Sequence, residues 1–199
     1  MTTLSDIRSR LRIDLRDTDS NAYRWTDAVL DRHIAHALED LGLAIPREVS
    51  ATLATTPGSR EVSTASLAGL VNVETVEFPT GQFPPAYVGF AYWAGNLHLH
   101  SDETPDGSDA KIWYVGRHTL DGSGSTVPVH LEDVLLMGAA AHALIEISLF
   151  AIDRLNTGGD DVTELYAAAG RARITAFNQL LEQYGRKNRL TGRRMFIPA

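Results

Sequence analysis

The sequence predicts an α+β protein: an antiparallel helical bundle of about four helices with an inserted small antiparallel β module and an extended C-terminal tail. Three observations predict this class. Apolar residues recur at steps of three and four near both ends of the chain, short β-branched and aromatic runs lie between them, and residues 186–199 are basic without a helical repeat. With 199 residues, 44 % of them hydrophobic, the chain is long enough to bury a substantial core.

Residues 1–48 are predicted to form the first pair of helices. Thr3 and Asp6 match a capping box at the start of one helix, and Thr26 stands before Asp27 at the N-cap position of the next. Apolar residues follow both caps at helical spacing: Leu4, Ile7, Leu11 and Leu15, and then Leu30, Ile34, Ala37, Leu38 and Leu41.

The loop between these helices begins like a calcium-binding loop, with Asp17, Asp19 and Asn21 at alternating positions. Ala22 stands where that motif needs Gly, and Ala28 stands where it needs a bidentate Glu. We therefore predict a solvated loop that connects two helices.

Residues 49–120 are predicted to form the β-rich insertion, because short strand-like runs alternate there with turns that contain Pro and Gly. His98 and His100 are two apart on a predicted strand, so both imidazoles face the same side, with Asp102 and Glu103 close by. This pattern fits either metal ligands or a polar strand face that ends in an acidic turn, and we favour the polar face.

Residues 121–185 are predicted to complete the bundle with a second pair of helices. The first starts near Glu132 and contains the small residues 138–141 (GAAA), which permit close helix–helix approach. His142 and Glu146, four apart on this helix, are interpreted as a structural pair at a helix or subunit contact. The last helix has an apolar stripe at helical spacing with Phe177 beside it; the stripe comprises Val162, Leu165, Ala169, Ala172, Ala176, Leu180 and Tyr184.

The charge of the chain is strongly asymmetric. Residues 1–170 hold 11 Lys and Arg against 24 Asp and Glu, whereas residues 171–199 hold 7 against 1, so net charges of −13 and +6 make up the total of −7. The tail, residues 186–199 (RKNRLTGRRMFIPA), cannot bury enough apolar surface to fold alone. We expect it to order on a partner.

Several classes of protein are disfavoured by composition. The chain has no cysteine, which excludes disulfides and zinc–thiolate sites, and its amino terminus lacks the apolar core of a signal peptide. The most apolar run, residues 134–152, contains His142, Glu146 and Ser148, so a core helix is favoured over a membrane span. The acidic body argues against bulk binding of duplex DNA.

Three passages resemble the head–tail adaptor (connector) proteins of tailed bacteriophages. The first is residues 23–30 (YRWTDAVL), which lead to residues 37–41 (ALEDL). The second is residues 112–120 (IWYVGRHTL), which run on to Val127 and Pro128. The third is residues 131–144 (LEDVLLMGAAAHAL), at the start of the long helix. With the basic tail, the resemblance covers most of the chain, although the β region is larger than in compact members.

The resemblance implies a non-enzymatic structural protein of the virion neck, without a cofactor or bound metal, that is present in the host cytoplasm during assembly. It implies a homo-oligomeric ring of twelve subunits beneath the portal protein, a downstream tail or stopper protein as second partner, and a channel through which DNA passes without sequence-specific binding. It implies no membrane partner. Portal contact then falls on the tail, with these residues: Arg186, Lys187, Arg189, Arg193, Arg194, Met195, Phe196 and Ile197.

Two alternatives remain open on the sequence alone. One is a metal-dependent hydrolase that uses His98, His100 and the nearby acids. The other is an accessory protein that binds nucleic acid through the basic tail, in which case Arg193 and Arg194 would contribute to a salt-dependent affinity.

Overall fold

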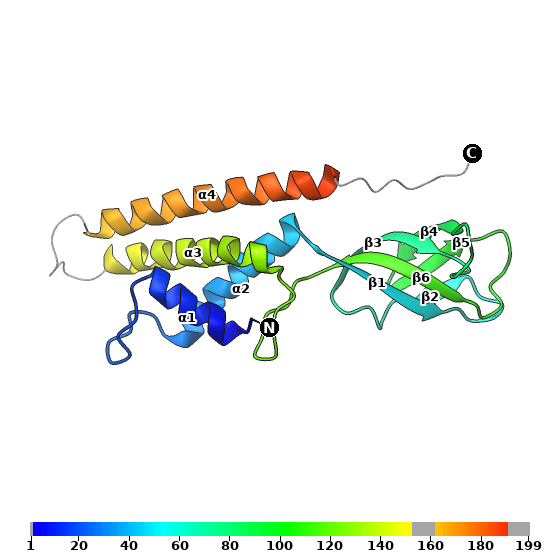
Figure 1. The fold of residues 1–199 in the computed structure, drawn as a ribbon, viewed down its shortest axis with the longest axis horizontal. Helices are drawn as coiled ribbons and strands as arrows, with labels where there is room; N and C mark the ends of the chain where they lie inside the picture. Colours follow the sequence, from blue (N-terminus) through cyan, green and yellow to red (C-terminus); the bar gives the residue numbers. More distant parts are fainter. Residues whose placement is uncertain (1, 153–161, 191–199) are drawn as a thin grey trace. The chain divides into compact units, whose positions relative to one another are not determined.

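A computed structural model describes residues 2–152 and 162–190, which form two compact units (Figure 1). The helical unit comprises the described residues up to Ile45 and from His118 onward, and the sheet unit comprises residues 46–117. Each unit has its own cluster of buried apolar side chains, and the two clusters share no residue. The predicted α+β class is confirmed.

Four α-helices and one short 3₁₀-helix make up the described part of the helical unit: α1 (Leu4–Asp14), α2 (Asp27–Ala44), η1 (Val129–Leu131), α3 (Glu132–Ile152) and α4 (Val162–Leu190). Both predicted caps are present. Thr3 and Asp6 form a reciprocal capping box, and the Thr26 hydroxyl accepts a hydrogen bond from the Val29 amide. These side chains satisfy amides that would otherwise lack partners at the helix starts.

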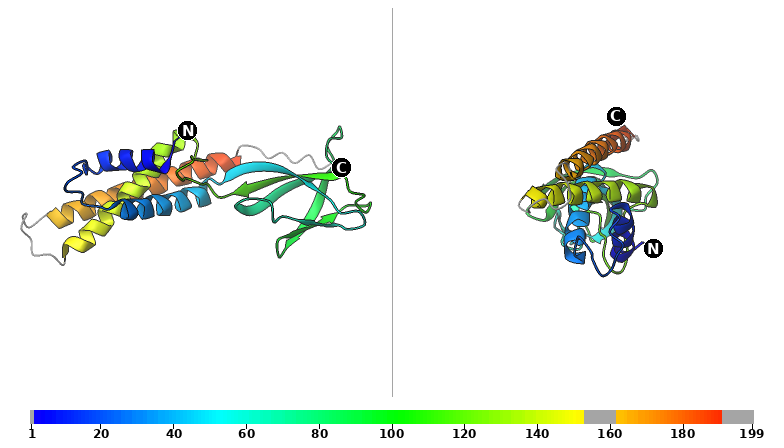
Figure 2. Two further views of the ribbon diagram at one scale, coloured as in Figure 1. Left: turned by 90° about the horizontal axis from the view of Figure 1, so that it is seen from below. Right: turned by 90° about the vertical axis from the view of Figure 1, so that its left-hand side faces the viewer.

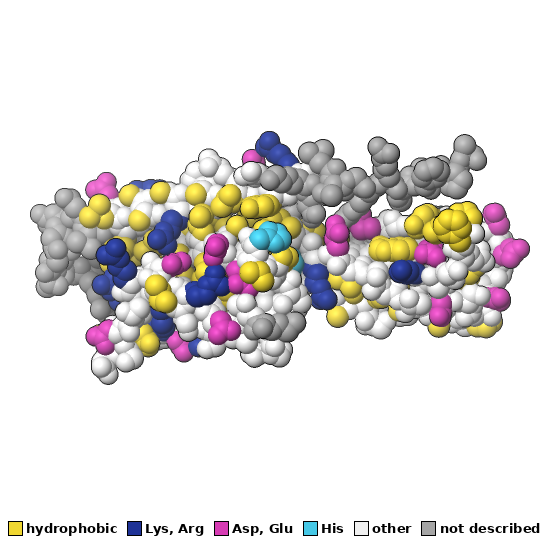
Figure 3. All heavy atoms as spheres, viewed as in Figure 1, with side chains coloured by type: hydrophobic (Ala, Val, Ile, Leu, Met, Phe, Trp, Pro, Cys, Tyr) yellow, Lys and Arg dark blue, Asp and Glu magenta, His cyan; other side chains and the backbone are white. Residues whose placement is uncertain are grey.

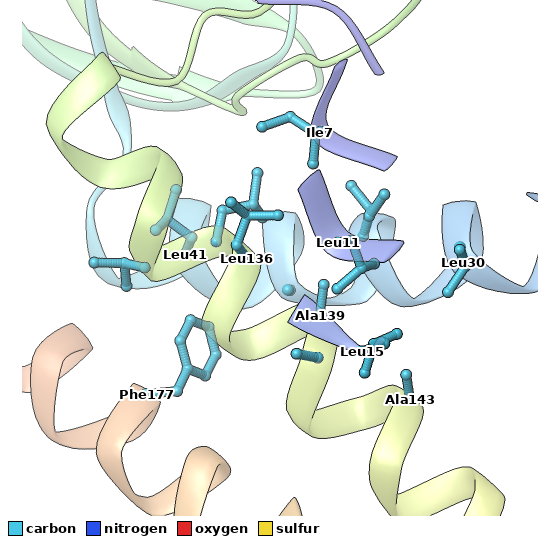
Figure 4. Packing of buried hydrophobic residues seen from close by; sticks show 14 of the residues in the cluster. Ile7, Leu11, Leu15, Leu30, Leu41, Leu136, Ala139, Ala143 and Phe177 are labelled. Carbon is cyan, nitrogen blue, oxygen red and sulfur yellow. The ribbon is translucent and has the colours of Figure 1, made fainter. Parts of the chain in front are cut away.

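The core of the helical unit is centred on α3, which contacts each of the other three α-helices. Two views show α3 between α4 on one side and α1 and α2 on the other (Figures 1 and 2). Leu11 of α1, Leu30 of α2, Ala139 of α3 and Phe177 of α4 have no more than 1 % of their surface exposed and lie in one cluster (Figure 4). The antiparallel bundle as such stays a prediction.

Close approach of α3 and α4 depends on glycine. A Cβ at Gly138 would lie 2.7 Å from Cζ of Phe177, and a Cβ at Gly170 would lie 2.8 Å from Cγ1 of Ile145. Each glycine therefore leaves the space that a bulky side chain of the facing helix occupies. The predicted use of small residues on α3 for close helix contact is confirmed.

The predicted apolar stripe of the last helix is wrong in its first turns. Further along, its members Leu180 and Tyr184 pack against the core, as predicted. Leu165 is 67 % exposed, and Ala169 and Ala172 are also exposed, whereas Phe177 and Leu181 are buried. Several positions of the predicted stripe are alanines, and so small a side chain does not specify which face of the helix turns inward. Phe177 does specify it, because the space above Gly138 accepts its ring.

The sheet unit is a six-stranded antiparallel sheet whose strands stand in the order β1-β6-β3-β4-β5-β2. The strands are β1 (Arg47–Ala54), β2 (Glu61–Ser63), β3 (Leu70–Glu77), β4 (Tyr87–Trp93), β5 (Asn96–His100) and β6 (Asp109–Gly116). The sheet curls (Figure 2), and β3 pairs with β4 only at Val76–Val88 and Glu77–Tyr87. Its concave side encloses a core that includes Val76, Leu97, Leu99 and Ile112, all without exposed surface.

The chain leaves and re-enters the helical unit at neighbouring points. His118, the first residue after the sheet unit, lies with its Nε2 2.9 Å from the carbonyl oxygen of Ile45, the last residue before it. The Nδ1 of His118 lies 3.1 Å from the carbonyl oxygen of Thr126. This buried imidazole therefore ties the two crossing points together.

Candidate partner-binding surfaces

The predicted portal-binding residues lie partly on a helix. Helix α4 continues to Leu190, so the prediction of an extended segment from residue 186 is wrong for residues 186–190. Arg186 is exposed, and its Nη2 lies 3.1 Å from Oε2 of Glu182 one turn earlier. Such an i,i+4 pair and the helix dipole both favour cations near a C-terminus, which explains why the basic run begins as helix.

The structure describes the other predicted portal-binding residues only in part. The backbones of Lys187 and Arg189 belong to α4. Arg193, Arg194, Met195, Phe196 and Ile197 lie outside the described residues. Portal contact by these residues therefore stays a prediction.

The loop between α1 and α2 is fixed by a buried ion pair rather than by a cation. The guanidinium of Arg12 contacts the carboxylates of Asp17 and Asp27, both at 2.6 Å, and lies 3.6 Å from the centre of the Tyr23 ring. The other oxygen of Asp17 accepts a hydrogen bond from the Arg24 amide at 2.8 Å. The predicted solvated loop is confirmed for residues 18–24, which are exposed, whereas Asp17 is buried and paired with Arg12.

A group of histidines and acids lies along the contact between α2 and α3. Nε2 of His33 lies 2.8 Å from Oε2 of Glu146, and Nε2 of His142 lies 3.5 Å from Oδ2 of Asp40. Although the first distance is short, its direction does not suit a hydrogen bond, so neither Nε2 has a hydrogen-bond partner among the described residues. The expected pairing of His142 with Glu146 is wrong, because Glu146 turns toward His33 and Arg32.

Burial lowers the pKa of His33, because a desolvated imidazole disfavours the charged form. The Glu146 carboxylate opposes this shift, and the positive charge of Arg32 adds to it. The ring of His36 lies 5.0 Å from that of His142, centre to centre. The arrangement is that of a helix contact between α2 and α3 that contains titratable groups.

His98 and His100 are both exposed on β5, and their ring centres are 6.0 Å apart. Among the described residues, no three His, Asp or Glu side chains come together so that they could hold a metal ion. The hydrolase alternative therefore has no assembled site to support it in this part of the chain. The polar strand face fits the alternation on β5, in which Leu97 and Leu99 face the core.

A groove of about 420 Å³ opens at the end of the sheet unit where β3 ends and β4 begins. Tyr87 and His100 line it, together with Asp102 and Glu103 of the loop between β5 and β6. Phe83, 96 % exposed, lies in the loop that leads to Tyr87. Hydrophobic side chains with acidic ones around them cover this end of the sheet unit (Figure 3).

Trp93 is the second exposed aromatic feature of the sheet unit, at 79 % exposure. The sequence predicts Trp25, Trp93 and Trp113 to be core or interface aromatics, and the exposure of Trp93 excludes the core for this residue. Trp25, by contrast, is a core residue at 4 % exposure. No described helix is long and apolar enough to cross a membrane.

Comparison with known proteins gives one family. A family model described as SU10 adaptor protein matches residues 2–195, which is nearly the whole chain. Among solved structures, a chain in the neck of an empty GTA particle, computed with C6 symmetry, is 14 % identical, with a TM-score of 0.32; the match covers 85 % of this chain and 88 % of that chain. Among curated proteins none matches.

Proposed function

The chain belongs to the SU10 adaptor protein family, and from that membership we propose that it is a structural protein of the virion neck, with no catalytic role or cofactor. In this proposal a ring of twelve copies joins the portal vertex to the tail and continues the DNA channel. The family match over residues 2–195 is the observation that carries the proposal, because it spans the helical unit and the sheet unit alike.

A closed ring needs a heterologous interface, in which one face of a subunit meets a different face of the next. The helical unit suits the wall of such a ring, because its loop and its helix starts are fixed by buried or capped polar groups. We propose that its four helices act as an antiparallel bundle. The sheet unit then reaches the neighbouring subunit or the downstream tail or stopper protein.

The basic C-terminal residues are proposed to bind the portal. Arginine offers a planar fork of donors for carboxylates, and Phe196 and Ile197 offer apolar anchors. Helix α4 delivers this segment, because it carries the chain as far as Leu190 in one rigid element. Portal contact then starts with Arg186, Lys187 and Arg189 on the helix and continues in the residues that follow.

The charge of the rest of the chain fits passage of DNA. With a net charge of −13 over residues 1–170, the protein offers little to attract phosphates, so DNA slides past it without sequence-specific contacts. The protein is proposed to assemble in the host cytoplasm and to remain in the neck of the virion.

Co-expression with the portal protein of the same genome, followed by electron microscopy of the purified complex, tests the proposal. We expect a ring of this chain stacked on the portal. Deletion of residues 191–199, which leaves α4 intact, should abolish stacking, whereas replacement of the exposed Arg171 by Ala should leave it unchanged. A portal that purifies without this chain at low and at moderate salt would contradict the adaptor role.

A further inference from the structure

The backbone beside Trp93 is fixed by a tight turn and by hydrogen bonds to that turn. It pairs with Asn96 across a two-residue turn in which Ala94 and Gly95 both have positive φ, at 46° and 81°. The amide and the hydroxyl of Thr64 both donate to the carbonyl oxygen of Gly95, at 2.9 and 2.7 Å. A large aromatic side chain on a fixed turn loses little conformational entropy when a partner covers it, which is the property of an interface anchor.

The groove near Tyr87, at the opposite end of β4 from Trp93, has the chemistry to bind an indole ring. Its volume of about 420 Å³ lies in the range of about 300–1,000 Å³ typical of pockets that enclose an organic group. Arg60 donates to the carbonyl oxygens of Ser101 and Asp102, both at 3.3 Å, which holds the loop in place. Among the described residues, the carboxylates of Asp102 and Glu103 have no hydrogen-bond or ion-pair partner, so they are available as acceptors.

The anchor and the groove belong to the same strand but cannot meet within one chain. Tyr87 begins β4 at the groove, and Trp93 ends β4 at the turn. At a rise of about 3.3 Å per residue, the two positions are roughly 20 Å apart. We propose that Trp93 of one copy occupies the groove of the next copy, so that the sheet units associate head to tail.

This inference rests on the proposed ring, for which a head-to-tail contact between two different surfaces is required. A second copy fits better than other occupants for reasons of chemistry. The indole N–H needs an acceptor when it is buried, and Asp102 and Glu103 supply one, while Tyr87 offers a ring for stacking. An anionic membrane or nucleic acid is disfavoured, since these acids would repel it.

Disulfide trapping tests the contact directly, because the chain contains no cysteine. One chain carries Asn96→Cys, beside an intact Trp93, and a second carries Thr104→Cys, an exposed position that lines the groove. A disulfide needs Cα atoms within about 7 Å, so the two sites can be joined only between copies. We expect a covalent heterodimer under mild oxidation at the highest soluble concentration, well above that of a control pair in which Ser50→Cys on β1 replaces Asn96→Cys.

Two further variants separate the anchor from the groove. Trp93→Ala removes the anchor and leaves the groove, whereas Gly89→Leu fills the groove and leaves the anchor; a Cβ at Gly89 meets nothing nearer than 3.5 Å, so this chain should fold. Each variant alone should self-associate about thirtyfold more weakly than the wild type, as expected when a dominant anchor is lost. Mixed, the two should form dimers that grow no further, because only one complementary contact remains.

The outcomes distinguish this inference from the proposed function. Rings on the portal with Trp93→Ala as with the wild type, and no trapping above the control, would overturn the head-to-tail contact and leave the adaptor role standing. Trapping of the heterodimer without rings on the portal would support the contact and count against the adaptor role. A portal or tail partner trapped in place of the second copy would also overturn the inference.

Discussion

At the scale of single residues, the most demanding position is Arg12. Its guanidinium is buried with Asp17, and both are less than 8 % exposed. A buried charge is costly unless its partner and hydrogen bonds are in place, which Asp17, Asp27 and the Trp25 carbonyl oxygen provide. The ring of Tyr23 covers the same guanidinium.

Replacing Arg12 by Met should therefore lower the free energy of unfolding by about 3–5 kcal/mol, because Asp17 is left as a buried charge without its cation. Urea titration followed by circular dichroism measures the loss. Arg171→Met, at an exposed position on α4, is the matched control and should change stability by no more than about 0.5 kcal/mol. Equal effects of the two substitutions would contradict the role of the buried pair.

The burial of His33 predicts how the stability of the folded protein changes with pH. Its pKa in the folded protein is lowered by burial, so the unfolded chain binds the proton more readily and the folded state loses stability as pH falls below the ordinary histidine value of about 6.5. Above that value the imidazole is neutral in both states and has no effect.

Urea midpoints at about pH 7.5 and pH 5.5, on either side of the ordinary histidine pKa of about 6.5, test this difference. The wild type should lose more stability between the two than His33→Gln does, since both chains retain Glu146, Arg32, His36 and His142 around the site. The same loss in both proteins would assign the effect to other groups.

At the scale of elements, the sequence predicts the existence of helices and strands better than it predicts their contacts. Caps at Thr3 and Thr26 are local and could be recognised, and so could the switch from helical to strand spacing after α2. The inward face of α4 could be found only for its second half, where Leu180 and Tyr184 pack against the core; in the first turns the predicted Leu165 is exposed. The groove could not be found from the sequence either, because it is formed by residues of β4 and β5 together with the segments that follow β3 and β5.

Gly138→Ala tests the fit between α3 and α4. The added methyl would lie 2.7 Å from Cζ of Phe177 and 3.0 Å from Cβ of Ala37, so overpacking should cost about 1–3 kcal/mol, reduced by the higher helix propensity of alanine. Thermal unfolding measures the change. Gly122→Ala, where no atom lies within 4 Å, is the control, and Phe177→Leu in the Gly138→Ala background should recover part of the loss.

At the scale of the whole molecule, the chain folds into two units with separate buried cores, and the backbone passes between the units twice, after Ile45 and before His118. The buried cluster of the helical unit draws on residues before and after the sheet unit, whereas the sheet unit draws only on itself. The two-part organisation follows from the change of sequence period and so was predictable. The tie between His118 and Ile45 was not, because a single imidazole between distant residues leaves no pattern in the sequence.

Replacing residues 46–117 by a short Gly–Ser linker should leave the helical unit folded. Loop closure changes by only about 0.6 kcal/mol for each doubling of loop length, so the thermal midpoint should stay within roughly 10 °C of that of the full chain. Circular dichroism should show a cooperative helical transition. A chain without cooperative unfolding would mean that the helices need the sheet unit to fold.

The tie at His118 also has an evolutionary consequence. An insertion that departs and returns at one point can be lengthened, shortened or exchanged without any change to the core that carries it. Selection can therefore act on the two units of this protein separately, since their buried clusters share no residue.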